Sequence, residues 1–280
     1  MSLDDFIGKE QPREEMHEFA GDILDSNDVK EMAVGSLTPP SEVPPLSSYS
    51  PEELKKIEFV NQVIHGDCIE KMDALPSNYV DLIVTDPPYL INYKTNHRQD
   101  KTHDFCTPIE GDTDKSLITN YIKQCYRIMK KDTAMYMFCS ADKVDFFKQE
   151  LEKWFKIKNM IIWVKNNWTA GDLEASFGRQ YEIIFLVNKG RKKINGKRIQ
   201  DVWFFDRVVG NQQVHQNQKP VDLIMQCIEK HSNEGELVFD GFGGSGSTAI
   251  ACLKTKRNYL LVEKEEAYVN IIQERIKKGE

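Results

Sequence analysis

Residues 237–248 read Leu-Val-Phe-Asp-Gly-Phe-Gly-Gly-Ser-Gly-Ser-Thr, which predicts a short apolar strand, a glycine-rich turn and the start of a helix. Glycines at such a turn let a ligand approach the backbone closely, and the amino terminus of the helix favours a negatively charged group. The strict G-x-G-x-x-G spacing and the lysine of a phosphate-binding P-loop are both absent. The turn therefore predicts a cofactor site of a kind shared by NAD, FAD and S-adenosylmethionine enzymes.

Glu263 follows the next apolar stretch, Tyr259–Val262, about 20 residues after the glycine-rich turn. An acidic residue at this spacing typically accepts hydrogen bonds from the two hydroxyls of a ribose. The alternative is a solvated charge beside Lys264 and Glu265. The spacing favours ribose binding, and hence a cofactor that contains a nucleoside.

Segments with strand and helix patterns alternate from Asn61 onward. The predicted strands are Gln62–His65, Val80–Thr85, Thr133–Cys139, Lys158–Val164, Glu182–Val187, Leu237–Asp240 and Tyr259–Val262. The predicted helices are Ser116–Met129, Lys143–Trp154, Pro220–His231, Ser247–Leu253 and Glu265–Lys277. This alternation predicts an α/β domain with a largely parallel sheet, whose ligands bind at the carboxyl ends of the strands. Two intervals, 90–114 and 188–218, are predicted to be long loops without strands.

The tetrad Asp86-Pro87-Pro88-Tyr89 follows the apolar run Val80–Thr85, which is a predicted buried strand. The two prolines remove two backbone N–H donors and keep the preceding residue extended. The backbone carbonyls stay available as acceptors, between a carboxylate and an aromatic ring. This combination predicts a site for a planar group that carries an NH₂, such as a nucleobase.

The net charge of −7 is concentrated near the N-terminus. Residues 1–56 hold 13 acidic and 5 basic residues, so the rest of the chain holds 31 acidic and 32 basic residues. The first 56 residues are also rich in Pro and Ser, and we therefore predict a flexible acidic tail over 1–56 and a folded domain over 57–280. The nearly neutral domain can carry a local basic patch for nucleic acid.

Several classes of protein are disfavoured by what the sequence lacks. No apolar run approaches the ~20 residues that span a membrane, and the N-terminus does not resemble a signal peptide. We therefore expect a cytoplasmic protein with no membrane partner. The six cysteines include no C-x-x-C pair, which argues against a zinc site or a disulfide framework. His97, His103 and Cys106 lie near one another but lack a fourth ligand, so no metal is expected.

Taken together, these residues resemble the β-class DNA amino-methyltransferases, specifically the adenine-N6 type. The resemblance covers roughly residues 61–278, in the order of that class: His65-Gly66-Asp67-Cys68, the tetrad at 86–89, His215-Gln216-Asn217-Gln218-Lys219-Pro220, and Phe242-Gly243-Gly244-Ser245-Gly246. Two elements depart from the family pattern. The family usually has Asp-Pro-Phe where this chain has residues 240–242, and H-P-T-Q-K-P where it has residues 215–220. The extra glycine, Gly241, is expected to loosen the cofactor loop by roughly 0.5–1 kcal/mol.

The resemblance implies a Rossmann-like methyltransferase fold in a circularly permuted order, with the tetrad strand before the glycine-loop strand and helices on both faces of the sheet. It implies S-adenosylmethionine as the methyl donor and N6 of a flipped adenine as the acceptor. The implied catalytic residues are Asp86, Pro87, Pro88 and Tyr89, with Tyr89 stacked on the base. The implied cofactor-binding residues are Asp67, Lys219, Asp240, Phe242, Gly244, Gly246, Ser247 and Glu263.

Double-stranded DNA is the expected partner, and two basic stretches are predicted to contact it. The first is the loop after the tetrad, with Lys94 and Arg98, for which a solvated surface loop is an equal alternative. The second is an insert around 189–214, which begins with a predicted basic hairpin turning at Asn195-Gly196. Its predicted DNA-binding residues are Arg191, Lys192, Lys193, Lys197 and Arg198. A homodimer and a cognate restriction endonuclease stay open as further partners.

Other functions compete with this interpretation. Cytosine-N4 enzymes usually carry Ser at the position of Asp86, so the sequence favours adenine without excluding cytosine. A non-catalytic DNA-binding protein with the same fold has no need of the intact tetrad. A nicotinamide enzyme leaves the two prolines unexplained. Methyltransferases of ribosomal-RNA guanine or protein glutamine carry similar tetrads, but their glycine loop comes first, whereas here it follows Asp86 by about 150 residues.

Overall fold

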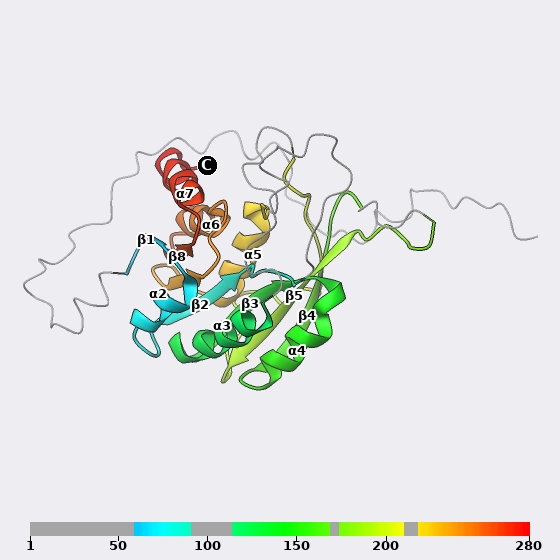
Figure 1. Ribbon diagram of the computed structural model, residues 1–280, viewed down its shortest axis with the longest axis horizontal. Coiled ribbons are helices and arrows are strands. Elements are labelled where there is room, and N and C mark those ends of the chain that lie inside the picture. The colour runs from blue at the N-terminus through cyan, green and yellow to red at the C-terminus, as the bar shows by residue number, and fades with distance from the viewer. Residues whose placement is uncertain (1–58, 91–113, 169–173, 210–217) are drawn as a thin grey trace, which may run out of the picture. The chain divides into compact units, whose positions relative to one another are not determined.

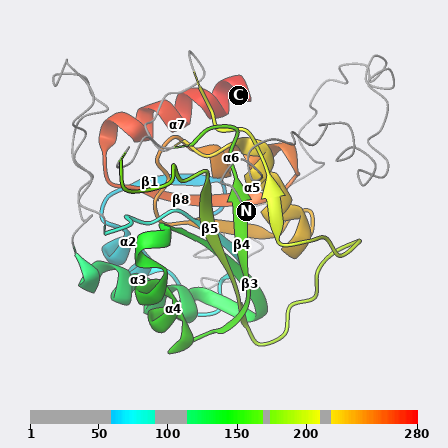
Figure 2. The same ribbon diagram turned by 90° about the vertical axis from the view of Figure 1, so that its right-hand side faces the viewer.

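A computed structural model describes residues 59–90, 114–168, 174–209 and 218–280. These residues form one eight-stranded sheet in the order β1-β8-β7-β2-β3-β5-β4-β6, shown from two sides in Figures 1 and 2. Among the described strands, only β5 runs against the others, since it pairs antiparallel with β3 and β4 and all other neighbours are parallel. The sheet is therefore mixed and mostly parallel, as the sequence predicts.

Helices separate most of the strands along the chain. The strands are β1 (Gln62–His65), β2 (Val80–Thr85), β3 (Met129–Cys139), β4 (Lys156–Val164), β5 (Tyr181–Lys189), β6 (Val202–Phe204), β7 (Leu237–Asp240) and β8 (Asn258–Glu263). The helices are α2 (Cys68–Ala74), α3 (Lys115–Ile128), α4 (Val144–Glu152), α5 (Val221–His231), α6 (Ser247–Lys254) and α7 (Glu266–Lys278), with a 3₁₀ turn, η5, at Ala141–Lys143.

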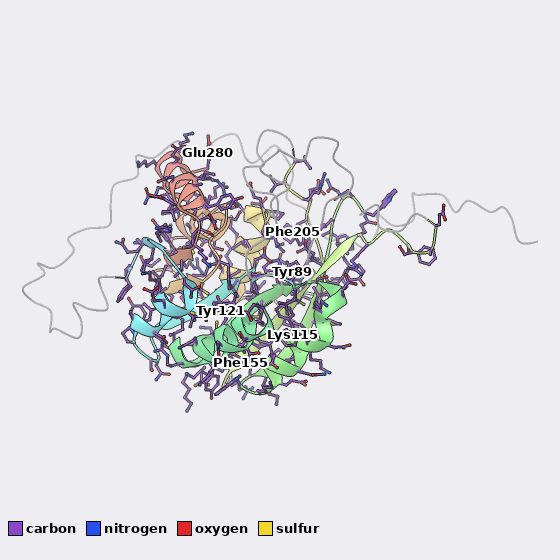
Figure 3. The ribbon with its side chains drawn as sticks, viewed as in Figure 1. Tyr89, Lys115, Tyr121, Phe155, Phe205 and Glu280 are labelled. Atoms are coloured by element: carbon purple, nitrogen blue, oxygen red, sulfur yellow. The ribbon has the colours of Figure 1, made fainter. Side chains whose placement is uncertain are left out.

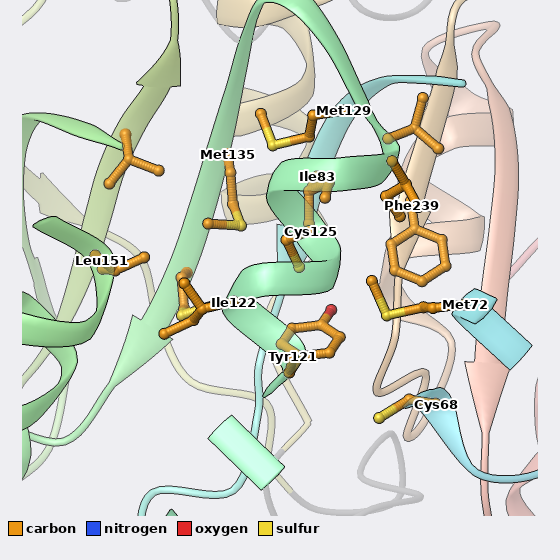
Figure 4. Packing of buried hydrophobic residues seen from close by; sticks show 14 of the residues in the cluster. Cys68, Met72, Ile83, Tyr121, Ile122, Cys125, Met129, Met135, Leu151 and Phe239 are labelled. Atoms are coloured by element: carbon orange, nitrogen blue, oxygen red, sulfur yellow. The ribbon is translucent and has the colours of Figure 1, made fainter. Parts of the chain in front are cut away.

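Two hydrophobic clusters form the core, and the side chains of the central strands alternate between them. In β2, Ile83 belongs to the cluster that includes residues of α2, α3 and α4. Leu82 and Val84 belong to the cluster that includes residues of α5, α6 and α7. Because successive side chains of a strand point to opposite faces, the helices cover both faces of the sheet. Figure 4 shows the first cluster, with Tyr121 and Cys125 of α3 packed toward the strands.

Most of the elements predicted from the sequence are confirmed. β1, β2 and β7 have the predicted bounds, and the other predicted strands and helices begin and end within a few residues of them. The helix α2 and the strand β6 were not predicted. β6 lies inside the interval 188–218, so the prediction of a strand-free loop there is wrong. Its three residues pair only with β4, at the end of the sheet, and so short a segment has no clear periodicity.

The basic hairpin predicted after β5 is also wrong. The chain turns at Gly196, whose φ is +63°, but residues 190–200 form no strand. The Asn195 backbone N–H instead donates to the Lys230 carbonyl at 2.8 Å, and its side-chain amide donates to the Ser232 carbonyl at 2.7 Å. The segment therefore packs on the end of α5 rather than pairing with itself.

The reversed direction of β5 determines what meets at each edge of the sheet. Tyr181, its first residue, pairs with Val164 at the end of β4, and Ile183 pairs with Cys139 at the end of β3. We call the edge where the other strands end and β5 begins the carboxyl edge. The amino edge lies opposite, where β2 begins and β5 ends at Lys189.

Two further expectations concern regions of the chain as a whole. Within the described ranges, no helix combines the length and the apolar character required to cross a membrane. The predicted acidic tail over 1–56 lies outside the described residues.

Candidate active site

The predicted catalytic tetrad lies at the carboxyl edge, directly after β2 (Figure 3, where Tyr89 is labelled). Pro87 and Pro88 are buried, so the backbone at this corner is held by packing as well as by its restricted φ angles. The Tyr89 hydroxyl donates to Asp86 Oδ1 at 2.6 Å and contacts Glu182 Oε2 at 3.0 Å. Asp86 and Tyr89 therefore form one hydrogen-bonded unit with a second carboxylate.

Lys219 is the cation of this unit. Its Nζ lies 2.5 Å from Asp86 Oδ2 and 3.4 Å from Glu182 Oε2, and its side chain is 8% exposed. Lys165, at the end of β4, pairs with the other oxygen of Glu182. The family resemblance implies a cofactor contact for Lys219, but the structure places its ammonium on the carboxylate of Asp86, the predicted catalytic residue. Only its backbone faces the glycine-rich turn, through a 2.8 Å hydrogen bond from the Ser247 hydroxyl to the Lys219 carbonyl.

Burial and charge act against each other on these groups. The pKa of Asp86 lies above its usual value, because burial and the nearby Glu182 raise it by more than Lys219 lowers it. Burial also raises the pKa of Glu182, but Lys219 and Lys165 outweigh that cost and lower it to about 2. The pKa of Tyr89 lies well above its usual value because of burial and the nearby Asp86. Tyr89 is therefore a hydrogen-bond donor, and Glu182 is a carboxylate, at neutral pH.

The glycine-rich turn joins β7 to α6 and is fixed to the end of β8. The Gly243 N–H donates to the Val262 carbonyl at 2.8 Å, and the Gly244 N–H donates to Glu263 Oε2 at 2.6 Å. Gly246 has a φ of +81°, and a Cβ there would lie 2.8 Å from Ile272 of α7. Gly246 is thus required by its backbone conformation and by the packing of α7, a reason that sequence reasoning does not supply.

Gly241 is where the chain departs from the family pattern, and Tyr121 of α3 explains the glycine. A Cβ at residue 241 would lie 2.6 Å from the Tyr121 hydroxyl and 2.5 Å from its ring. The Gly241 N–H donates to that hydroxyl at 3.2 Å, a bond that proline cannot make, and the hydroxyl also bonds Thr85 Oγ1 at 2.7 Å. The Tyr121 ring meets Phe242 edge-on at 4.8 Å between centroids. These contacts hold the turn in place despite the flexible residue.

Glu263 ends β8, and Asp67 lies just after the end of the neighbouring strand β1, so both lie at the carboxyl edge. His65 pairs with Glu263, and the Gly66 N–H donates to the Glu263 carbonyl at 2.9 Å. Asp67 is the N-cap of α2, where its Oδ1 accepts from the Ile69 N–H at 2.9 Å. The Glu263 carboxylate accepts backbone N–H groups at both oxygens, among them those of Gly244 at 2.6 Å and Glu265 at 2.9 Å. Both residues therefore present anchored carboxylates beside the glycine-rich turn.

The side chains of three other residues predicted to bind the cofactor contact neighbouring groups of the protein. Asp240 accepts from the Phe242 N–H at 3.1 Å and from Thr248 Oγ1 at 2.7 Å, and burial raises its pKa to about 7. The Ser247 hydroxyl donates a hydrogen bond to the Lys219 carbonyl. The Phe242 ring packs on Tyr121. These side chains shape the turn, and any cofactor contact of theirs stays a prediction.

Some predicted residues fall outside the described part of the chain. Lys94 and Arg98, the candidate metal ligands His97, His103 and Cys106, and residues 215–217 of the third motif lie there. Their predicted roles stay predictions.

The second predicted DNA-binding stretch lies at the amino edge, away from the tetrad. β5 ends at Lys189, whose ammonium donates to the Tyr126 and Met129 carbonyls and to Asn78 at 2.7, 2.7 and 2.9 Å. Lys192 lies 3.9 Å from Glu236. Arg191, Lys193, Lys197 and Arg198 are exposed nearby. The structure therefore does not bring the cations of this second stretch to the predicted catalytic residues.

Sequence reasoning missed Glu182, Lys165 and Tyr121. Glu182 had one visible signal, since it is a charged residue directly before the apolar run Ile183–Val187 of a predicted central strand. Lys165 follows a strand end and looks like any solvated lysine. Tyr121 looks like an ordinary member of the apolar face of α3. Only the pairing of β4 with β5 and the packing of α3 reveal what these side chains contact.

Comparison with known sequences places this geometry in a family. A model of the DNA methylase family matches residues 80–274, more than two thirds of the chain. The chain is 32% identical over 223 residues to the putative methylase YubD of Escherichia coli (strain K12), covering 78% of this chain and 90% of YubD. It is 27% identical over 245 residues to the DNA adenine methyltransferase YhdJ of the same strain, covering 75% of this chain and 80% of YhdJ.

Comparison with solved structures agrees at the level of the fold. The M1.HpyAVI–SAM complex superposes with a TM-score of 0.60 and 25% identity, covering 77% of this chain and 98% of that one. The PvuII DNA methyltransferase (cytosine-N4-specific) gives a TM-score of 0.62 with 15% identity, covering 78% and 93%. The chain thus has the α/β fold of DNA methyltransferases. Since the matched region contains both the tetrad and the glycine-rich turn, the chain belongs to the DNA methylase family, the N6/N4 amino-methyltransferases of DNA.

Proposed function

We propose that this DNA amino-methyltransferase moves a methyl group from S-adenosylmethionine to the exocyclic N6 of an adenine flipped out of double-stranded DNA. The observation that carries this proposal is the Asp86 carboxylate, held beside Pro87 at the end of β2 by Tyr89 at 2.6 Å and by Lys219 at 2.5 Å. An exocyclic amine is a weak nucleophile, and an anchored pair of acceptors is what activates it.

The residues around the glycine-rich turn fit the cofactor by the chemistry of their groups. Glu263 is 8% exposed and has lone pairs beyond the two that accept the Gly244 and Glu265 N–H groups, which suits the hydroxyls of a ribose. Asp67 supplies an acceptor for the amino group of the cofactor's adenine. When bound, S-adenosylmethionine supplies a methyl group on a positively charged sulfur. The fit supports this donor for the present chain, as does the similar fold of M1.HpyAVI, whose structure is a complex with SAM.

The tetrad performs the remaining chemistry through positioning and electrostatics. The Asp86 carboxylate and the Pro87 carbonyl accept hydrogen bonds from the two N–H groups of the target amine, which directs the nitrogen lone pair at the methyl carbon. When the methyl group passes to the nitrogen, the bond between the methyl carbon and sulfur would break and its electron pair would stay on sulfur as a neutral thioether, while Asp86 would take the proton that the nitrogen loses. Lys219 Nζ lies over one face of the Tyr89 ring, 5.4 Å from its centroid. The base therefore stacks on the other face of the ring. A base inside a duplex cannot reach this corner, so the adenine must be flipped out.

The chain order supports a circular permutation of the Rossmann-like fold. The tetrad strand β2 precedes the glycine-turn strand β7 in the sequence, and the two are neighbours in the sheet. The acidic tail, the folded domain over 57–280, a homodimer and a cognate restriction endonuclease stay predictions.

Cytosine-N4 methylation is the second candidate, because the fold is compatible with either base. The fold matches a cytosine-N4 enzyme and adenine-type relatives alike, so the fold does not choose the base. The choice of adenine depends on Asp86, where the cytosine enzymes usually carry Ser. An intact, anchored tetrad disfavours a DNA-binding protein without activity, because such a protein has no use for an acceptor buried among charges.

Base-resolution mapping of methylated bases in DNA from cells that express the chain tests the proposal. We expect N6-methyladenine at one short sequence, and no mark in cells that express Asp86→Ala. N4-methylcytosine at a defined sequence would establish the second candidate instead. An unmodified genome, together with no transfer of label by the purified protein, would contradict both.

A further inference from the structure

Three charged side chains at the carboxyl edge have no assigned part in the methyl transfer. Lys219, Glu182 and Lys165 have side chains that are 8%, 18% and 21% exposed. Removing charges from water is costly, and well-packed apolar residues of the same volume are often at least as stable. Stability alone therefore does not explain why two lysines and a glutamate surround Asp86.

The geometry connects both oxygens of Asp86 to Glu182. Tyr89 bonds Oδ1 of Asp86 at 2.6 Å and Oε2 of Glu182 at 3.0 Å. Lys219 bonds Oδ2 of Asp86 at 2.5 Å and lies 3.4 Å from the same oxygen of Glu182. Glu182 is thus the common anchor of the two groups that hold the catalytic carboxylate. Its other oxygen is paired with Lys165.

Lys219 is positioned for Asp86 and not for the glycine-rich turn. Its Nζ lies 5.1 Å from the Phe138 ring centroid and 5.4 Å from that of Tyr89, so two aromatic rings line its path. Its carbonyl is bonded to the Ser247 hydroxyl, which fixes the backbone before α5 independently of the side chain. Replacing the Lys219 side chain therefore leaves the backbone link to the turn in place.

The charges determine how Asp86 behaves as an acceptor. Burial raises the pKa of Asp86, Lys219 lowers it and Glu182 raises it. A protonated Asp86 would turn one acceptor oxygen into a donor, which an amine N–H cannot use. The titratable groups around Asp86 are Tyr89 after β2, Cys139 on β3, Lys165 after β4, Glu182 on β5, Lys219 before α5 and Asp240 on β7.

We propose that Lys219 and Glu182 are positioning residues of the methyl transfer. Lys219 favours the ionised form of the Asp86 carboxylate and orients it toward the amine, and Glu182 holds Lys219 and Tyr89 in place. The inference rests on the proposed function of Asp86 and adds two residues to it. It also gives Lys219 a role different from the cofactor contact that the sequence motif implies.

Four variants and a control test this proposal. Lys219→Met removes the cation, Lys219→Arg keeps it, Glu182→Gln removes the anchor charge, and the double variant Lys219→Met with Glu182→Gln removes both. Lys130→Met is the matched control, because Lys130 pairs with Asp81 at 2.7 Å at the other end of β2. Two quantities are measured: the pH dependence of kcat, and the titration of the Asp86 carboxyl carbon by ¹³C NMR in the protein alone, assigned with Asp86→Asn.

In Lys219→Met we expect Asp86 to titrate at higher pH, because the group that lowers its pKa is gone. Activity then falls at least about tenfold at slightly acid pH and partly recovers as the pH rises, since a pKa that is higher by one lowers the ionised fraction about tenfold at any pH well below it. In Glu182→Gln, Asp86 titrates at lower pH and kcat falls because Tyr89 and Lys219 lose their anchor. The double variant titrates between the two, Lys219→Arg restores most of the activity that Lys219→Met loses at slightly acid pH, and Lys130→Met keeps the wild-type profile.

An Asp86 titration that does not move in Lys219→Met would overturn the proposal, as would equal loss of kcat at every pH. Binding of S-adenosylmethionine by calorimetry shows that each variant is folded, and a Kd raised by Lys219→Met with kcat unchanged would assign Lys219 to the cofactor instead. The NMR titration needs no methyl transfer. If the wild-type protein proves inactive on adenine, the proposed function fails while the titration still reports on the charges around Asp86.

Discussion

The two ends of β2 each carry an aspartate paired with a lysine, but the surroundings of the two pairs differ. Asp81, at the amino edge, is 2.7 Å from Lys130, whose side chain is 44% exposed. Asp86, at the carboxyl edge, is 2.5 Å from Lys219, whose side chain is 8% exposed. An ion pair whose lysine is open to water contributes little to stability, whereas a buried ammonium such as that of Lys219 depends strongly on its partner. The same two residue types therefore form a pair with an exposed lysine at one end of the strand and, at the other end, a pair with a buried lysine that the proposed function assigns to the chemistry.

The largest difference is expected on replacing the two aspartates one at a time. Asp86→Asn should lower kcat at least about 100-fold, because the amide also presents N–H donors where the amine needs an acceptor. Asp81→Asn should leave kcat within about twofold and lower the free energy of unfolding by about 0.5–1.5 kcal/mol. Steady-state methylation and urea denaturation measure the two quantities. Similar losses of kcat in both variants would remove the distinction between the edges.

Tyr89 allows the contribution of an aromatic ring at the carboxyl edge to be separated from that of its hydroxyl. Tyr89→Ala should lower kcat/KM for DNA about 10- to 100-fold, because stacking of a base on an aromatic ring is worth about 1–3 kcal/mol. Tyr89→Phe keeps the ring and loses the bonds to Asp86 and Glu182, so a smaller loss is expected. If the two variants are equally impaired, the hydroxyl and not the ring carries the role.

Within the carboxyl edge, Glu263 should affect the cofactor and not the chemistry. Glu263→Gln should raise the Kd for S-adenosylmethionine about tenfold, which corresponds to about 1–2 kcal/mol for a hydrogen bond to a charged acceptor, and should leave kcat at saturation unchanged. Glu265→Gln is the matched control, because that neighbouring side chain is exposed. Isothermal calorimetry measures both. An unchanged Kd for Glu263→Gln would place the ribose elsewhere.

The smallest effect is expected at the amino edge. Replacing Arg191, Lys193 and Lys197 with Gln should leave the salt dependence of DNA binding unchanged, because these exposed residues lie away from the tetrad. Fluorescence anisotropy over a range of salt concentrations measures the slope. A smaller slope in the triple variant would support the DNA contact predicted from the sequence and would mean that the DNA reaches both edges of the sheet.

The sequence reveals elements whose patterns are local and misses contacts made between distant strands. β2, β7 and the glycine-rich turn are visible because apolar runs, prolines and glycines mark them directly. The contact between Asp86 and Lys219 cannot be seen in the sequence, since the fold brings together two residues that are 133 positions apart. The basic stretch after β5 has the composition of a nucleic-acid site, but the direction of β5 carries it to the far edge. The composition of a segment indicates what kind of ligand it suits, and the direction of the strand before it determines at which edge of the sheet the segment lies.

The link between β4 and β5 offers a place for engineering. Its two ends are joined by hydrogen bonds of 2.8 Å from the Lys165 N–H to the Gln180 carbonyl and 2.7 Å from the Gln180 side chain back to the Lys165 carbonyl. Lys165 and Glu182 at its base are thereby held whatever length of chain lies between them. We therefore expect segments of other lengths inserted at this junction to leave the ion pair of Lys165 and Glu182 in place.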